Sequence, residues 1–106
     1  MAKATQKETQ GKMKSPHKLE RHFKGVANHR RIQILLLVFK CPDISLVGIA
    51  ERVNSNMKTI AEHTRRLVIA GLVEKSHTGT SVAHKLTPYG QEFVQFIETF
   101  SRHGAN

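Results

Sequence analysis

Apolar residues recur at three- and four-residue steps through much of this chain, which is the spacing of amphipathic helices. In one stretch the pattern occurs twice and is interrupted at residues 54–56, Asn-Ser-Asn. Ser45 and Asn56 stand where a short side-chain oxygen can cap a first helical turn. We therefore predict two helices joined by a tight turn, a helix-turn-helix. The repeated apolar positions are Leu46, Ile49, Ala50 and Val53 in the first helix, and Ile60, Leu67 and Val68 in the second.

Two further helices are predicted before this motif. Leu19, Phe23 and Val26 can share one face of a short helix that ends at Gly25 or Ala27. Residues 29–40 are apolar nearly all round, as expected of a helix buried in a core or an interface. Pro42 disfavours helical geometry at the residue before it and so closes this helix.

A hairpin and a last helix are predicted after the motif. Gly71 fits a left-handed cap that ends the second helix of the motif. Residues 72–76 and 81–86 read as strands, with HTGT as the turn. Thr87 and Pro88 suit the cap and first residue of a helix. The predicted fold is mainly α with a small β-hairpin, about five helices plus a two-stranded wing. The last helix carries an apolar stripe of Phe93, Phe96, Ile97 and Phe100.

Length and charge bound the class of protein. The 106 residues suit one small domain, whose core is marginal unless a partner subunit adds buried area. Seventeen Lys and Arg against eight Asp and Glu give a net charge of +9, which points to a polyanionic partner. Residues 1–31 hold nine basic and two acidic side chains, and residues 32–106 hold eight and six. Much of the basicity therefore lies outside the helix-turn-helix.

The cellular compartment can be predicted from the number of cysteines and from the lack of long apolar segments. Cys41 is the one cysteine, so no disulfide forms within the chain. We expect Cys41 to serve as a small buried apolar residue. We read residues 1–16 as a basic flexible tail and 17–103 as the folded domain. No signal-peptide core is present in the tail, and the apolar run at residues 32–39 is too short to span a bilayer. We expect a cytoplasmic protein with no membrane partner.

Four segments, in their order and spacing, resemble winged helix-turn-helix transcription regulators of the ArsR kind, with the MarR kind as a close second. They are FKGVANHRRIQIL, ISLVGIAERV, TIAEHTRRLVIAGLVEK and LTPYG, and the resemblance runs from about Leu19 to Phe100. It implies a regulator that binds double-stranded DNA, with the helix after Asn56 in the major groove and residues 72–86 as the wing. Arg31 matches an arginine of the family. It either forms a surface salt bridge, or it contacts a phosphate or makes a structural bond.

The resemblance and the polar faces together give candidate DNA contacts. Glu62 can accept from a cytosine amino group or hold an arginine in place. His63 either contacts DNA or packs where two helices meet. Because strand residues alternate, half of the polar wing residues must face away from any one surface. The candidates are Asn56, Lys58, Thr59, Glu62, His63, Arg65 and Arg66 on the helix, and Lys75, His77, Thr78, Thr80, Ser81 and Lys85 on the wing.

Partner contacts are expected at the two ends of the domain. On the residues alone, the stripe of the last helix is either part of the chain's own core or a subunit interface. Regulators of this kind dimerise through terminal helices, so the resemblance favours a homodimer. The expected interface residues are Leu19, Phe23, Phe93, Phe96, Ile97 and Phe100.

Effector and catalytic signals are weak, and we expect no enzyme activity, cofactor or metal. The Cys pairs of many ArsR-kind metal sensors are absent, and Glu92, Glu98 and His103 lack a paired histidine. His77 and His84 can face each other across the wing, which alone does not make a zinc site. The leading function is a dimeric repressor. The alternative is a winged helix that binds proteins or RNA without promoter-specific DNA binding.

Overall fold

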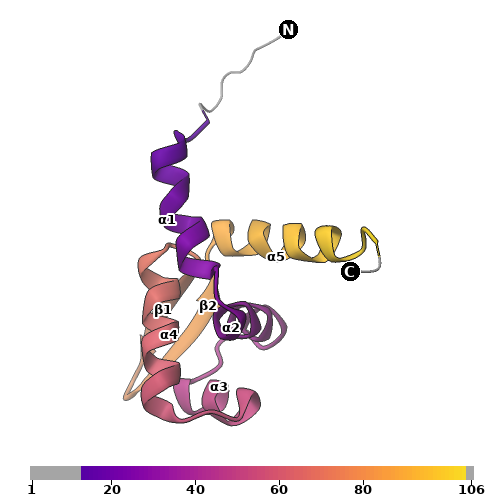
Figure 1. Ribbon diagram of the computed structural model, residues 1–106. Helices are drawn as coiled ribbons and strands as arrows, with labels where there is room; N and C mark the ends of the chain where they lie inside the picture. The colour runs from indigo at the N-terminus through magenta and orange to yellow at the C-terminus, as the bar shows by residue number, and fades with distance from the viewer. Residues whose placement is uncertain (1–12, 105–106) are drawn as a thin grey trace, which may run out of the picture.

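The computed structural model describes residues 13–104, which form five helices and one β-hairpin (Figure 1). The predicted fold class is confirmed. None of the helices in this range has the length and hydropathy needed to cross a membrane. In chain order the elements are α1 (Pro16–Val26), α2 (His29–Lys40), α3 (Leu46–Val53), α4 (Met57–Ile69), β1 (Val73–Thr78), β2 (Ser81–Leu86) and α5 (Pro88–Ser101).

The helices begin where short polar side chains satisfy free N–H groups of the first turn. Ser45 Oγ accepts from the N–H of Gly48 at 3.1 Å, and Thr87 Oγ1 accepts from that of Gly90 at 3.0 Å. Ser15 caps α1 in the same way, with Pro16 as the first helical residue. Residues 1–12 of the predicted tail lie outside the described part, so the boundary between tail and domain stays a prediction.

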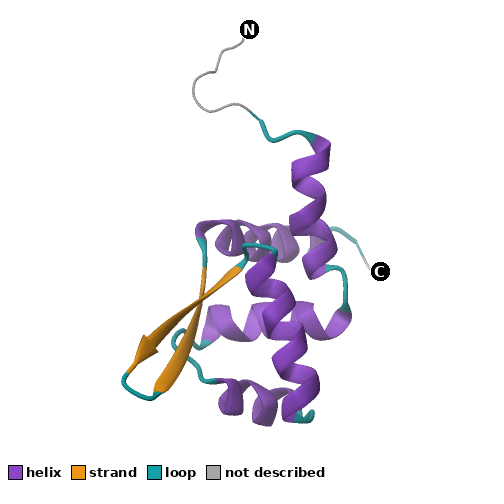
Figure 2. Ribbon diagram, turned by 90° about the vertical axis from the view of Figure 1, so that its left-hand side faces the viewer, coloured by secondary structure: helices purple, strands orange, loops and turns teal. Residues whose placement is uncertain are grey.

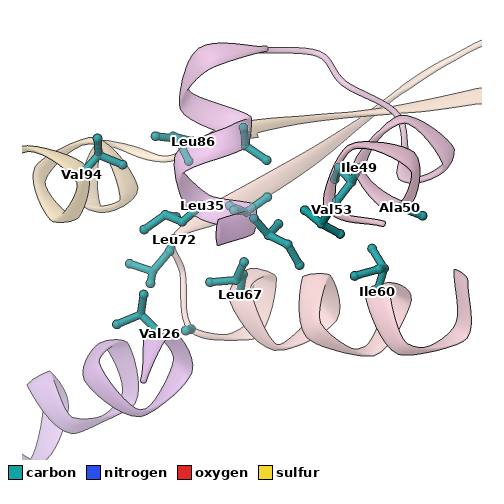
Figure 3. Close-up of a cluster of buried hydrophobic side chains, with 14 residues drawn as sticks. Val26, Leu35, Ile49, Ala50, Val53, Ile60, Leu67, Leu72, Leu86 and Val94 are labelled. Carbon is teal, nitrogen blue, oxygen red and sulfur yellow. The ribbon is translucent and has the colours of Figure 1, made fainter. Parts of the chain in front are cut away.

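The core is built around α2, which the other elements surround. Ile34 and Leu35 are fully buried and meet Ile49 of α3, and Ile60 and Leu67 from α4, in one apolar cluster. Figure 3 shows the labelled members of this cluster, among them Leu35, Ile49 and Leu67, converging between the helices. Burial of this set fixes α3 and α4 against α2, because each apolar stripe has one face to bury.

The end of α4 is closed by a glycine in the left-handed region. Gly71 has a φ of 77°, and its N–H donates to the carbonyl of Val68 at 3.0 Å. The N–H of Leu72 donates to the carbonyl of Leu67, also at 3.0 Å. This is the double-bonded Schellman arrangement, in which the αL residue is most often glycine. The left-handed cap predicted at Gly71 is confirmed.

The hairpin pairs antiparallel from Val73 with Leu86 to Thr78 with Ser81. The loop is therefore only Gly79 and Thr80, and the predicted four-residue turn is wrong because residues 77 and 78 continue the strand. In Figure 2 the hairpin projects from the side of the helical body. Its base is held by an isolated bridge between His84 and Ile44, which lies just before α3.

Helix α1 docks on the end of α4, as both views show (Figures 1 and 2). Arg21 Nη1 donates to the carbonyl of Ile69 at 3.0 Å, and His22 Nδ1 lies 2.6 Å from that of Ala70. A Cβ added at Gly25 would lie 2.1 Å from the Cβ of Ala70. Only glycine allows the two helices to approach this closely.

Replacing Gly25 with Ala is expected to lower the free energy of unfolding by about 1 to 3 kcal/mol, because the added methyl group forces α1 away from Ala70. Chemical denaturation measures the change. The matched variant is Gly25→Ala with Ala70→Gly, which removes the opposing Cβ and should recover part of the loss. A single variant more stable than the natural chain would contradict the close packing.

Candidate nucleic-acid interface

Helix α4 buries one side and exposes the other. Ile60, Thr64 and Leu67 face the core. The opposite side is open to solvent and carries three cations and one carboxylate. Its exposed polar residues are Lys58, Thr59, Glu62, Arg65 and Arg66, all among the predicted DNA contacts.

The start of α4 presents polar groups outward. Asn56 Oδ1 accepts from the N–H of Thr59 at 2.9 Å, which occupies its side-chain oxygen as a cap and leaves its amide N–H groups free to donate. Lys58 and Thr59 are exposed in the first turn. The first N–H groups of a helix have no intrahelical acceptor and carry the positive end of its dipole, so this end suits an anion.

Glu62 binds both arginines of its own helix. Its Oε1 accepts from Arg65 Nε at 3.0 Å, and its Oε2 accepts from Arg65 Nη2 at 3.2 Å and from Arg66 Nε at 2.8 Å. The hydrogen bonds from Arg65 and then Arg66 lower the pKa of the Glu62 carboxyl to about 2. Of the two roles predicted for Glu62, holding an arginine is the one it performs in the free protein.

His63 lies half-buried on the side of α4 that faces α2. Burial, then the charges of Arg31 and Arg30, lower the pKa of its imidazole, so the ring stays neutral at physiological pH. Arg30 Nη1 donates to the carbonyl of Val53 at 3.1 Å and ties α2 to the end of α3. His63 therefore lies near the arginines of α2, and its role in DNA binding or in helix packing stays a prediction.

Arg31 is half-buried and takes part in no ion pair with any residue of 13–104, so the structure gives no support to a surface salt bridge for it. Its Nε is buried without a hydrogen-bond partner in that same range.

The predicted wing contacts are exposed but divide between two faces of the hairpin. The register puts Lys75 and His77 on one face, and Thr78, Ser81 and Lys85 on the other, as strand alternation requires. Lys85 Nζ lies 3.8 Å from Asp43 Oδ1, a weak ion pair between exposed groups. Thr80 belongs to the two-residue loop.

The predicted approach of His77 and His84 across the wing is wrong. His77 pairs with Val82, and His84 pairs with Lys75. His84 is buried, and its Nδ1 lies 2.9 Å from the carbonyl of Ile44, so it holds the hairpin base rather than a metal. Within residues 13–104 no three His, Cys, Asp or Glu side chains cluster as metal ligands.

The predicted interface residues form an aromatic stripe over α1 and α5, defined here by Phe23, Phe93, Phe96 and Phe100. Phe23 meets Phe93 edge to face with ring centres 5.2 Å apart, and Phe96 stacks on Phe100 at 5.5 Å. Phe93 packs partly on the core, as Ile97 does, whereas Phe96 and Phe100 are 55% and 67% exposed. A groove of about 270 Å³ runs between the helices and includes Leu19 in its lining.

Sequence reasoning missed the polar contacts that seat α1. His22 is 2% exposed, stacks on Tyr89 with ring centres 4.8 Å apart, and bonds to Ala70 forty-eight residues away. Nothing in the local pattern distinguished it from the surface histidines. The one available signal was its place beside Phe23 on the short first helix, since a polar residue on a buried face must find a partner.

The carboxyl of Glu62 should titrate with a midpoint near 2 instead of 4.5, and Arg65→Gln should raise that midpoint by removing the largest contribution. Side-chain NMR titration measures both. Because the pKa is lower in the folded than in the unfolded chain, the stabilisation is present above about pH 4.5 and is lost as the pH falls towards 2. In Glu62→Gln, the free energy of unfolding should not show this decrease between pH 4.5 and 2. A natural midpoint near 4.5 would show that the contacts do not persist in solution.

Comparison with known proteins shows which solved structures share this fold. No protein-family model matches the chain, and no curated protein sequence matches it. Among solved structures, the homodimeric winged helix-turn-helix DNA-binding domain (fragment 1-100) of Mb0332 from Mycobacterium bovis, described as a possible ArsR-family transcriptional regulator, superposes with a TM-score of 0.77. The identity is 23%, over 85% of this chain and 83% of that one.

Two further structures agree. Reduced HlyU from Vibrio cholerae has a TM-score of 0.71 and 20% identity, over 82% of this chain and 92% of its own. FabT from Streptococcus pneumoniae, solved in complex with DNA, has a TM-score of 0.65 and 13% identity, over 81% of this chain and 66% of its own. The resemblance inferred from the sequence motifs is confirmed at the level of the fold: this chain is a winged helix-turn-helix.

Proposed function

We propose that this chain is a transcription regulator that binds double-stranded DNA as a homodimer and represses by occupying a promoter. The observation that carries the proposal is the exposed cationic side of α4, held outward by a helix whose other side is buried in the core. The fold supports it, because Mb0332 is described as a DNA-binding domain and FabT was solved with DNA.

In this proposal α4 lies in a major groove. Its first turn brings Lys58 and Thr59 to base edges, and its free N–H groups face a phosphate. Asn56 contributes its amide donors beside them. His63 is half-buried at the α2 junction and supports the helix from behind rather than touching DNA.

The hairpin acts as the wing, with its exposed tip against the flanking minor groove or backbone. Because its polar residues divide between two faces, only one set touches the duplex. Lys75 and His77 form one set, and Thr78, Ser81 and Lys85 form the other. The second set is the less cationic, since Lys85 lies near Asp43.

The homodimer is proposed to form through the aromatic stripe. Phe96 and Phe100 are exposed on a terminal helix, and a chain of this size gains needed buried area by covering them. Mb0332 is described as homodimeric. Two symmetry-related α4 helices would then read an inverted repeat with half-sites about 34 to 36 Å apart. We propose that the protein acts in the cytoplasm.

The alternative functions differ at the exposed side of α4. A protein-docking winged helix would present apolar or acidic side chains there, whereas this one presents Lys58, Arg65 and Arg66. RNA shares the phosphate charge, so binding to duplex DNA and to structured RNA must be compared over a salt series.

Lys58→Ala is expected to weaken binding to the preferred duplex by about 1 to 3 kcal/mol if Lys58 reads a base, and to reduce the salt slope by about 0.9 if it contacts a phosphate. Fluorescence anisotropy on duplexes selected from a random pool measures both. Lys40→Ala, which removes the same charge from the exposed end of α2, is the matched control. Equal effects of the two variants would remove α4 from the interface.

Phe96→Glu combined with Phe100→Glu is expected to convert a dimer into a monomer, because it places two carboxylates in the proposed apolar contact. Light scattering measures the mass at micromolar concentration, and footprinting should shrink from two half-sites to one. Gln91→Glu combined with Gln95→Glu, at two exposed residues of α5 outside the aromatic stripe, is the control. A natural chain that is monomeric and protects a single asymmetric half-site would contradict the dimer.

A further inference from the structure

Glu62 occupies the middle of the exposed side of α4, between the two arginines. With about 100° of turn per residue, Arg65 lies roughly 60° to one side of Glu62 and Arg66 roughly 40° to the other. One carboxylate thus accepts three N–H groups from both neighbours. The three side chains form a fixed group, named here the Glu62 clamp.

We propose that Glu62 is a specificity-determining positioning residue, which orients Arg65 to read a guanine and restrains Arg66 from indiscriminate phosphate binding. This inference rests on the proposed DNA-binding function and names the base that one part of the site recognises.

The orientation follows from which N–H groups are already used. Arg65 donates its Nε hydrogen and one Nη2 hydrogen to the carboxylate of Glu62. Both Nη1 hydrogens and the second Nη2 hydrogen have no acceptor among residues 13–104, and they include the outer edge of the guanidinium. That edge presents two parallel donors, as bidentate binding to O6 and N7 of guanine requires. Arg65 is therefore aligned before DNA arrives.

Arg66 is held differently. Within residues 13–104 it donates through Nε alone, to Glu62 at 2.8 Å, and its two terminal nitrogens have no hydrogen-bond partner there. Its angular offset from Glu62 is no larger than that of Arg65, so the two arginines differ in the number of hydrogen bonds that hold them. A single-point tether of this kind suits a phosphate contact, to which Arg66 can turn without releasing Arg65.

The Glu62 clamp adds little to the stability of the fold, but it changes the net charge on the exposed side of α4. Its side chains are about half exposed, at 48%, 57% and 56% for Glu62, Arg65 and Arg66, and exposed ion pairs are worth little. With its pKa at about 2, however, Glu62 remains ionised at physiological pH and offsets one of the two cations. A carboxylate at the centre of the exposed side also repels phosphate when the helix sits out of register, which penalises wrong sites.

The experiment compares the natural chain with Glu62→Gln, Arg65→Gln and a control, Glu98→Gln. The control removes the same single negative charge from the exposed side of α5. Each protein is assayed on the duplex selected from a random pool, on the set of its single base-pair variants, and on an unrelated duplex over a salt series.

Arg65→Gln should lose discrimination at one G·C pair, roughly 5- to 150-fold in relative affinity. Glu62→Gln should lose discrimination at that same pair while binding the unrelated duplex more tightly than Glu98→Gln does. Its salt slope should steepen by about 0.9 for each added phosphate contact. A purely structural role for Glu62 would leave base discrimination unchanged.

Three results would overturn the inference. Identical behaviour of Glu62→Gln and Glu98→Gln would reduce the effect to overall charge. Loss of discrimination in Glu62→Gln at a pair that Arg65→Gln leaves intact would mean that Glu62 reads a cytosine directly. Failure of the natural chain to bind any duplex at low salt would remove the proposed function itself, and that outcome is distinct from the other two.

Discussion

The arrangement of this molecule depends on how the carboxyl end of α4 is satisfied. The last carbonyls of a helix have no intrahelical donors, and leaving them unpaired when buried is costly. Here Val68 and Leu67 are bonded by the N–H groups of Gly71 and Leu72, while Arg21 and His22 of α1 reach Ile69 and Ala70. Thr87 Oγ1 donates to the carbonyl of Gly71 at 2.6 Å. Four elements therefore meet at one corner.

That corner determines where the candidate interface points. The same bonds that end α4 also set the direction of β1 and the start of α5, so the recognition side, the wing and the aromatic stripe are fixed relative to one another. His22 is the buried member, stacked on Tyr89 and bonded to Ala70. A polar group in this position favours one docking of α1, since any slip leaves a buried nitrogen and a carbonyl unpaired. In the proposed homodimer, contacts of α1 with the partner subunit would be linked directly to α4.

Most of the fold could be predicted from the sequence because its signals are local. The caps at Ser45, Asn56 and Thr87 and the αL residue at Gly71 each act within a few residues. The exposed side of α4 followed from the same periodicity. What failed was non-local: His84 meets Ile44, and His22 meets Ala70, across forty and forty-eight residues. The hairpin loop was misjudged because strand propensity in HTGT is weak, and pairing across the ladder decided it.

In the part of the chain that the structure describes, the hairpin contacts the helical body through its base. Asp43 and Ile44 bond to the backbone of His84, and Leu86 and Val73 are buried, but residues 74–81 are all exposed. Nothing in the core therefore constrains the length or composition of the tip. The tip can therefore accept insertions or substitutions without disturbing folding. The length of the hairpin can diverge independently of the rest of the domain.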